Sequence, residues 1–515
     1  MKTVLGDIVG LEQAAFIEGR DLFDNSMLTH ELAFKYNRSL VSPRCILKVD
    51  IKKAFDSVNW SFLADMLHLM EVLSRLLRKL PSYSGFSYHP KCVKINLTHL
   101  IFADDLLVFT RGDLLSIQAV DNCLAQFVGY SGLRINPMKS NLYFGGVSLP
   151  LKKLILEATG YVEGDLPVRY LGIPLFSSRL TQKMFTPLLD KIKDKLSHWA
   201  NNMLSYAGKI ALINSVIFGL QSFWGASVLL PKGIIKQIQK LCKDFLWGIA
   251  DGHRRLVFKS WDSICLPRQE GGLNIKEILS WNKTQMMVWA RKIEMDTSTI
   301  WAKWVKAYIL KGTDFWQFHL TSANSWFWHN VIYCRDMLIL ATGGISQAKI
   351  LIGQAKFKSE IYELLRKKGA SFSKTKTLGD SCNYPKHEVI GVLDAQNRLP
   401  TVDNLCKRGL IIVNRCALCE AQSESIHHLL FECSMSAAVW KEVAVWVGAT
   451  PAIKLRAIFD WYRMHNRGKS WIKRQRRCAF VCAIYLLWKE RNQRIFQGID
   501  LCIGHCLAIK YTGTP

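Results

Sequence analysis

The sequence has no repeat of fixed period, no low-complexity segment and no long apolar run. Its longest stretch without a charged residue, 210–231, includes Asn214 and Gln221 and spaces its apolar positions as a helix does. This pattern predicts a buried core helix rather than a membrane span. The first ten residues contain Asp7 and no long apolar run, so we expect no signal peptide. With 49% hydrophobic and 21% charged residues, the composition excludes a wholly disordered chain.

Acidic residues are scarce: 41 Asp and Glu stand against 68 Lys and Arg, which gives a formal net charge of +27. This excess favours a polyphosphate partner and, less strongly, an anionic membrane surface. The 15 cysteines are odd in number and follow no regular framework, so we expect reduced thiols rather than disulfides. The sequence therefore predicts a nuclear or cytoplasmic protein that is not secreted and has no membrane partner.

Three aspartates in the first part of the chain lie next to apolar runs. An apolar strand-like run ends at Asp50, and a helical pattern begins soon after. Asp104 and Asp105 lie between two further apolar runs, which predicts a hairpin with an Asp-Asp turn. Such a turn is commonly a solvated loop tip, but Asp50 also ends a buried strand. We therefore expect the three acids to meet at one edge of a sheet.

Carboxylates packed together resist joint ionisation unless cations neutralise them. Two divalent ions about 3.5–4 Å apart would do so, and they would suit in-line phosphoryl transfer. Magnesium fits this chemistry, because carboxylate and phosphate oxygens complete its octahedron. The pattern thus predicts two Mg²⁺ ions at the three aspartates.

Residues 49–58 and 102–105 resemble the two metal-binding motifs of reverse transcriptases, most closely those of LINE-type, non-long-terminal-repeat elements of plants. The resemblance extends over roughly residues 11 to 498. Residues 13–20 resemble the fingers of that family, and residues 131–140 resemble its palm. Its thumb and connecting region are resembled by residues 170–175, 204–209 and 271–275.

The resemblance implies an α+β fold with fingers and palm of the right-hand polymerase type, a helical thumb and connector, and a small zinc-binding helical domain. It implies RNA-directed DNA polymerase activity on an RNA template and a DNA primer, with Asp50, Asp104 and Asp105 as the catalytic metal ligands. Phe55 would lie under the incoming sugar and leave no room for a 2′-hydroxyl, the group that distinguishes RNA from DNA. Lys139 would lie near the triphosphate. Read without the family, Phe55 is favoured as a core aromatic on a helix face, and Lys139 is equally well a solvated loop residue.

One block of the family pattern is missing. Asp104 follows Asp50 by only 54 positions (104 − 50), and the Arg-Gln-Gly-Asp-Pro-type segment that shapes the nucleotide and template site in that family does not occur between them. Leu69 runs directly into Met70, whose surroundings resemble the sequence that follows the block. We therefore expect a truncated palm and an impaired polymerase. The alternative is a non-catalytic relic that binds nucleic acid and zinc; a metal-dependent nuclease is weaker, because no motif supplies a water-activating base.

A second cluster, C-x2-C-x8-H-x4-C, comprises Cys416, Cys419, His428 and Cys433. Four such ligands predict one tetrahedral structural zinc at ~2.0–2.3 Å, against the alternative of chance clustering. Residues 398–403 and 434–440 resemble the zinc-binding domain that follows the polymerase in plant elements of this type. That family pattern favours His428 over His427 as the ligand.

A basic helix is expected from about Lys469 to Phe496. Its first turns contain a dense group of cations near Trp471, which suits phosphate contact with base stacking; the alternatives are a solvated helix face and a nuclear import signal. The cations are Lys473, Arg474, Arg476 and Arg477. The predicted domains are a partial fingers and palm region (1–145), thumb and connector helices (146–250), a linker or connector region (251–385), a zinc-binding domain (386–445), and the basic helix with its tail (446–515).

Overall fold

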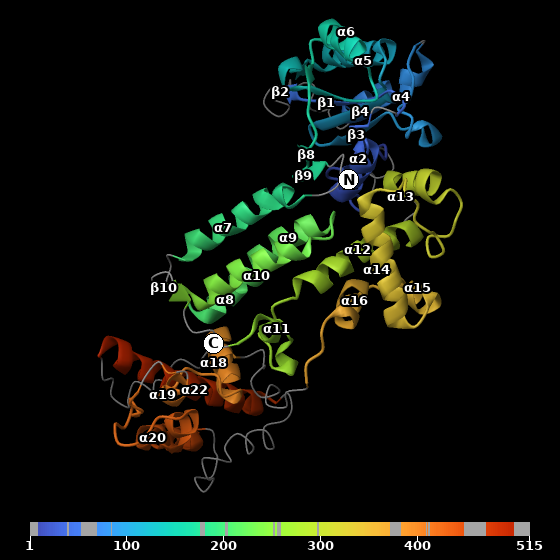
Figure 1. Ribbon diagram of the computed structural model, residues 1–515. Helices are drawn as coiled ribbons and strands as arrows, with labels where there is room; N and C mark the ends of the chain where they lie inside the picture. Colours follow the sequence, from blue (N-terminus) through green and yellow to red (C-terminus); the bar gives the residue numbers. More distant parts are fainter. Residues whose placement is uncertain are drawn as a thin grey trace. The chain divides into compact units, whose positions relative to one another are not determined.

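The computed structural model is mixed α+β, with helices predominating (Figure 1). It describes residues 9–38, 41–52, 69–83, 85–175, 181–200, 204–250, 253–254, 259–295, 298–370, 383–407, 409, 412–446 and 470–498. The chain divides into two compact units that interleave along the sequence. Unit 1 comprises 1–186, 222–231 and 280–365, and unit 2 comprises 187–221, 232–279 and 366–515. The mixed α+β class expected from the sequence is confirmed, whereas the contiguous domain boundaries and the right-hand polymerase arrangement stay predictions.

Unit 1 is built on a five-stranded sheet with the order β3-β4-β1-β6-β7. All neighbouring strands are antiparallel except β6 and β7, which are parallel. The strands are β1 (Arg44–Val49), β3 (His99–Phe102), β4 (Asp105–Arg111), β6 (Asn141–Gly145) and β7 (Val162–Glu163). Two small antiparallel pairs accompany them: β2 (Ile51–Lys52) with β5 (Arg134–Ile135), and β8 (Val168–Tyr170) with β9 (Ile173–Leu175).

Both faces of the sheet are covered, because successive side chains of a strand point to opposite faces. On β1, Leu47 and Val49 pack into one core, and Ile46 packs into the other. The first core is completed by α4 (Leu69–Lys79), α5 (Leu114–Ser131) and α6 (Leu149–Thr159). The second core contains α2 (Leu22–Ala33) and the tryptophan-rich helices that follow later in the chain.

Those later helices of unit 1 are α12 (Ile278–Met295), α13 (Ile300–Val305), α14 (Trp326–Thr342), α15 (Ile345–Gly353) and α16 (Phe357–Leu365). Trp301, Trp304 and Trp328 are fully buried among them, and the rings of Trp301 and Trp328 stack 6.3 Å apart. The Trp304 indole N–H donates to the Lys91 carbonyl at 2.7 Å. The tryptophans of this region thus form core rather than surface.

In the described residues of unit 2, the regular elements are helices apart from the short pair β10 (Ile249–Ala250) and β11 (His253–Arg254). Its first helices are α7 (Thr186–Ala200), α8 (Tyr206–Leu212) and α10 (Lys232–Trp247), followed by α11 (Trp261–Ile264). Its last are α18 (Pro385–Ala395), α19 (Val402–Cys406), α20 (Ser434–Trp446) and α22 (Trp471–Gln497), with α22 packed against α18 and α20.

The uncharged stretch 210–231 begins in α8 and continues through a π-helical turn (Ile213–Ile217) into α9 (Phe218–Gly225). Ile210, Ile213 and Ile217 are buried on one side of it. In the described part of the chain, no helix combines the length and the apolar character needed to span a membrane. The cysteines of the same part are free thiols.

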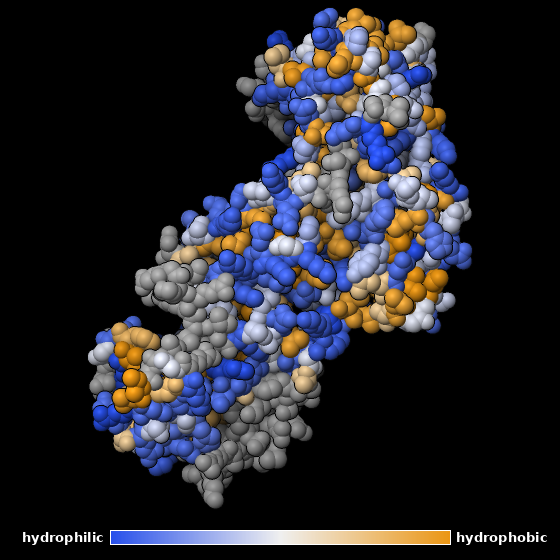
Figure 2. Space-filling view, in the orientation of Figure 1, coloured by the Kyte–Doolittle hydropathy of each residue, from blue (hydrophilic) through white to orange (hydrophobic). Residues whose placement is uncertain are grey.

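Hydrophilic residues cover much of the face shown in Figure 2, and hydrophobic ones gather in patches over α5 and α6 and over α14 and α15. Exposed apolar residues of these four helices include Leu115 of α5, Leu149 of α6, Leu340 of α14 and Ile350 of α15.

Candidate metal centres

The three aspartates lie at the same end of two neighbouring strands. Val49, the last residue of β1, pairs with Leu106 of β4, so Asp50 and Asp105 are the next residues on each side of that pair. The Asp50 backbone is fixed on both sides: its N–H donates to Ser140 Oγ at 3.0 Å, and its carbonyl accepts from the Asn136 N–H at 2.9 Å. The expected meeting at one sheet edge is therefore present in the backbone.

The hairpin has the position expected from the sequence, but its turn is shifted by one residue. Phe102 pairs with Asp105, so the two turn residues are Ala103 and Asp104 rather than Asp104 and Asp105. Ala103 has a φ of 54°, which an alanine seldom adopts. The shift follows from burial, because Leu106 and Leu107 must enter opposite cores and thereby fix the register.

The aspartate side chains do not converge. Among the described residues, one group of metal-ligating side chains has all its ligand atoms within 4.8 Å of one another, and the aspartates are not in it. Like charges separate when no cation joins them. Asp105 in addition pairs with Lys48, whose Nζ lies 3.4 Å from its carboxylate. The oxygen donors suit Mg²⁺ in kind, while their arrangement falls short of a compact ligand set.

Several residues near this edge escaped the sequence reasoning. Tyr170 is buried, and both its burial and the nearby Asp105 charge raise the pKa of its phenol. Ser140, which holds Asp50, directly follows Lys139, an exposed residue that ends a 3₁₀ turn. Lys48 had a signal in the sequence, because it is the one charged residue in the run 45–49. Phe55 lies outside the described residues.

The four Cys and His residues of the second cluster do converge: the ligand atoms of Cys416, Cys419, His428 and Cys433 all lie within 4.8 Å of one another. Cys419 Sγ is 3.3 Å from His428 Nε2. The Cys-x-x-Cys segment is a tight turn in which the Glu420 N–H donates to the Cys416 carbonyl at 2.9 Å.

His428 and Cys433 are brought together by the chain between them. His428 begins a π-helical turn (His428–Glu432), and the Cys433 N–H donates to the His428 carbonyl at 2.7 Å. Three of the four ligands are buried, and Cys419 is half-buried. The donor set of three sulfurs and one imidazole is the set that tetrahedral zinc takes in structural sites.

The cluster already favours a thiolate. Hydrogen bonds from the Cys416 thiol and from the N–H groups of Met435 and Ser436, at the start of α20, together lower the pKa of Cys433 to about 7, against the effect of burial. The hydrogen bond between Cys416 and Cys433, together with burial, raises the pKa of Cys416. A thiolate is the form of cysteine that binds metal, so one ligand is prepared for a cation.

His427 lies outside the cluster. Its side chain is 45% exposed, and its Nδ1 is 3.3 Å from the Glu432 carboxylate. Its ring faces that of Phe431 at 5.7 Å. The geometry therefore separates the two adjacent histidines in the way that the family pattern favours.

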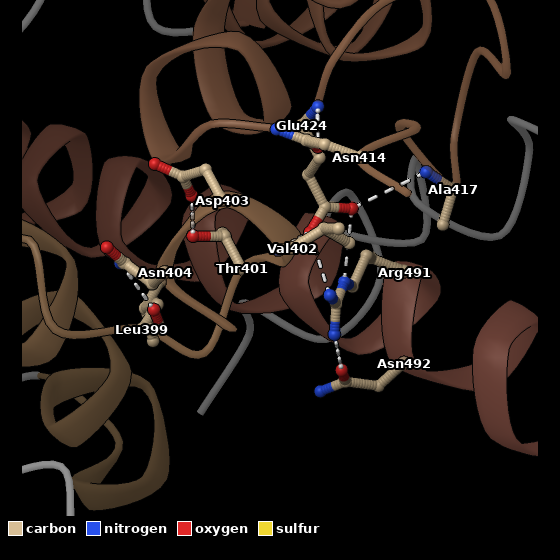
Figure 3. A network of polar contacts seen from close by, with 10 residues as sticks. All are labelled: Leu399, Thr401, Val402, Asp403, Asn404, Asn414, Ala417, Glu424, Arg491 and Asn492. Carbon is tan, nitrogen blue, oxygen red and sulfur yellow. Dashed lines mark hydrogen bonds and ion pairs between the residues drawn. The ribbon is translucent and has the colours of Figure 1, made fainter. Parts of the chain in front are cut away.

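A buried ion pair joins the cysteine segment to α22 (Figure 3). Glu424 is fully buried, and its carboxylate accepts from Arg491 Nη2 at 2.7 Å and from Arg491 Nε at 3.3 Å. It also accepts from the N–H of Val402 at 2.8 Å and of Ala417 at 3.4 Å. One carboxylate thus ties together α19, the Cys-x-x-Cys turn and α22.

A second arginine of α22 reaches the same turn. Arg494 donates to the carbonyl of Leu418, between the two cysteines, at 3.1 Å, and to Glu490 at 2.9 Å. Sequence reasoning gave these α22 residues no role, because the partners are 67 residues apart for Arg491 and Glu424 and 76 for Arg494 and Leu418. The helix expected from Lys469 to Phe496 spans Trp471–Gln497.

The four predicted nucleic-acid-binding cations do not share one exposed surface. Arg477 is buried, with 7% of its surface exposed, whereas Lys473, Arg474 and Arg476 are half-buried. Arg477 therefore lies inside unit 2 rather than on a solvated helix face, and the prediction that the four cations bind nucleic acid stays a prediction. The burial follows from helical geometry, because Arg477 lies on the side of α22 that also buries Phe480, Val481 and Ile484.

Comparisons with known proteins agree with the cysteine cluster. The family described as zinc-binding in reverse transcriptase matches residues 357–440, which begin before the 386–445 segment expected from the sequence. A protein named as a ribonuclease H protein of Arabidopsis thaliana is 24% identical over 129 residues, covering 25% of this chain and 21% of that protein. The uncharacterised 149 kDa protein of transposon TX1 from Xenopus laevis is 24% identical over 330 residues, covering 53% of this chain and 24% of that protein.

The chain thus spans only about a fifth to a quarter of the length of these curated relatives. Together with the convergence of Cys416, Cys419, His428 and Cys433, the matches support a protein of retrotransposon type that is related to reverse transcriptases and has a zinc-binding domain.

Proposed function

We propose that the chain derives from the reverse transcriptase of a LINE-type element of the kind found in plants, and that it binds nucleic acid with a module held by one structural zinc. The observation that carries this proposal is the Cys/His cluster, whose ligand atoms lie within 4.8 Å of one another inside the segment matched by the reverse-transcriptase zinc-binding family. The net charge of +27 supports a nucleic-acid partner. The location proposed is nuclear or cytoplasmic.

Cys416, Cys419, His428 and Cys433 would hold the zinc. Four protein ligands leave no open position for water or substrate, so the ion would act by holding the fold rather than by catalysis. Binding energy at such sites is folding energy. The zinc would therefore fix the Cys-x-x-Cys turn against the start of α20.

The ancestral reaction would be RNA-templated addition of deoxynucleotides to a DNA primer, with Asp50, Asp104 and Asp105 holding two Mg²⁺ ions. In this chain we infer that the reaction is impaired. The segment that shapes the nucleotide site in that family is missing from the sequence. In addition, the Lys48 ammonium pairs with the Asp105 carboxylate, where a metal ion would otherwise bind. Displacing a reacting group by about 1 Å lowers the rate ~10²-fold, so the loss of a whole segment that positions the nucleotide should lower it further. The Lys48 ion pair also favours the second candidate, a non-catalytic relic that binds nucleic acid and zinc.

The zinc assignment is tested on the purified full chain by metal analysis and chelator competition. We expect about one zinc per chain, and a loss of affinity of at least ~10²-fold for Cys433→Ser, because one of four ligands is removed. His427→Ala is the matched control and should bind zinc as the parent chain does. Equal zinc content in the parent chain and in Cys433→Ser would remove the proposed site.

The polymerase assignment is tested by primer extension on a primed RNA template with Mg²⁺ and deoxynucleotides. We expect little or no extension by the chain as it stands, and activity after the missing segment is inserted behind Leu69. Asp104→Ala in the restored chain should abolish that activity. Robust extension by the unrestored chain, lost in Asp50→Ala, would show that the polymerase is intact. A restored chain without activity would favour the relic.

A further inference from the structure

Unit 2 contains a hollow of about 380 Å³ outside the cysteine cluster, between the beginning of α8, α18 and the second half of α22. Its volume falls within the ~300–1,000 Å³ that small-ligand sites have. We call it the α18–α22 hollow. The lining residues that the following argument uses are Lys386, Tyr485, Trp488, Lys489, Asn492 and Phe496.

Aromatic rings supply much of the wall. The Tyr485 ring is half-buried, and it is fixed by the His387 ring, whose centroid lies 4.4 Å away. Trp488 is 6% exposed, with its body in the core. Phe496 also lines the hollow, and its ring is 78% exposed. Rings of this kind stack with nucleobases of any sequence.

The charge of the lining has one sign. Lys386 and Lys489 are exposed, and Lys386 Nζ lies 5.5 Å from the centre of the Tyr485 ring. No carboxylate is among the lining residues of this hollow. Three acids lie on the same two helices. Glu490 is buried and accepts from Arg494, Glu388 is buried and pairs with Arg268 at 2.9 Å, and Asp394 is buried outside the lining.

The remaining lining groups suit a base edge. Gln493 and Gln497 each offer an amide, which both donates and accepts hydrogen bonds, and Asn492, whose Oδ1 already accepts from Arg491 Nη1 at 3.0 Å, offers its amide N–H groups. The combination of rings, amides and cations without carboxylates matches an unpaired nucleotide, whose base needs a ring and polar partners and whose phosphates need cations. In a duplex the base faces are covered by their neighbours and are not available for stacking.

We propose that the α18–α22 hollow binds an unpaired nucleotide of single-stranded RNA or DNA. The base packs against Tyr485, beside the small exposed part of Trp488, and accepts from the amide N–H of Asn492, and the flanking phosphates lie against Lys386 and Lys489. Phe496 covers the adjoining base. This inference rests on the proposed nucleic-acid-binding function and adds to it a position and a preference for single strands over duplex.

The test measures binding of the full zinc-loaded chain to four labelled probes of equal length by fluorescence anisotropy. The probes are oligo(U), oligo(dT), a duplex, and an abasic strand that has phosphates but no bases. We expect Tyr485→Leu to weaken oligo(U) and oligo(dT) on the order of 5-fold or more, since stacking contributes at that scale, and to leave the abasic strand unchanged. Tyr485→Phe keeps the ring and should restore binding.

Two further comparisons use exposed residues, whose substitution leaves the core intact. Phe496→Ala should weaken single-strand binding, whereas Ile495→Ala removes a neighbouring exposed apolar side chain outside the lining and should not. Lys386→Gln with Lys489→Gln should weaken all four probes more than Lys236→Gln with Lys441→Gln, which removes equal charge from exposed positions elsewhere in unit 2.

The outcomes separate the two proposals. If the parent chain binds none of the probes, the nucleic-acid function itself fails. If it binds them but the Tyr485 and Phe496 variants match the parent, the hollow is not the site. The proposal would also be overturned if Tyr485→Leu weakened the binding of abasic and base-containing strands to the same extent, because stacking would then make no contribution. A photocrosslink from 4-thiouridine to the peptide containing Tyr485 and Trp488 would support it directly.

Discussion

Arg491→Met should loosen the zinc centre, although Arg491 is not a ligand. Its guanidinium is 3% exposed and donates twice to the fully buried Glu424, which in turn accepts from the backbone N–H of Ala417 inside the Cys-x-x-Cys turn. Methionine keeps much of the side-chain volume and removes the charge. The substitution therefore leaves the Glu424 carboxylate buried, with backbone donors as its remaining partners.

The expected magnitude follows from the cost of an unpaired buried charge. Removing one partner of a buried ion pair costs about 3–5 kcal/mol. Because the folding of such a module and its metal binding are one equilibrium, much of this cost should appear as weaker zinc binding. Since ~1.4 kcal/mol corresponds to tenfold, about 3 kcal/mol predicts a loss of roughly 10²-fold in zinc affinity.

Chelator competition on the full chain measures this loss. Lys441→Met is the matched control, because Lys441 is exposed on α20 and its substitution should change zinc affinity by less than about threefold. The double substitution Glu424→Gln with Arg491→Met should cost less than the sum of the two single ones, since it leaves no isolated charge. Zinc affinity in Arg491→Met within threefold of the parent would refute the coupling between α22 and the cysteine turn.

Two other predictions concern unit 2. Burial, with a smaller contribution from Lys386, lowers the pKa of His387 to about 4, so the unfolded chain binds more protons than the folded one between pH 6.5 and 4. The free energy of unfolding should therefore fall by up to about 3 kcal/mol as the pH drops through that window. The His387→Phe variant should lose less stability over the same window. Hydrogen-exchange protection of α18 at pH 6.5 and at pH 4.5 measures the difference. Replacing the three half-buried cations of α22 should reduce the slope of log K against log salt for duplex DNA by up to about 3, and an unchanged slope would show that they contact no phosphate. They are Lys473, Arg474 and Arg476.

The cysteine cluster could be predicted because its information is local. All four residues fall within 416–433, and the structure brings together the same four. The strand before Asp50 and the hairpin that contains Asp104 and Asp105 were predictable for a similar reason, since their strands are short apolar runs next to an acid. The helix of the C-terminal region also has nearly the predicted bounds, Trp471–Gln497.

What the sequence could not supply were the contacts that depend on register and on distant partners. The one-residue shift of the hairpin turn depends on which of Leu106 and Leu107 faces which core, and both are equally apolar. The Lys48 ion pair with Asp105 needs two strands to be paired in that register. The burial of Arg477 depends on which side of α22 meets the rest of unit 2, and a dense run of cations gives no sign of that.

The covered sheet bears on how the fold would persist if, as proposed, a palm segment is missing. Although Asp104 follows Asp50 by only 54 positions (104 − 50), β1 still pairs with both β4 and β6. The Leu69–Met70 junction lies at the start of α4, and Leu73 and Leu77 of this helix are completely buried in the core that also contains α5. A core filled in this way keeps its free energy of folding from apolar burial and strand pairing, neither of which requires the nucleotide site. Loss of the missing segment should therefore reduce chemistry far more than folding, which is the condition under which a relic retains a stable nucleic-acid-binding surface.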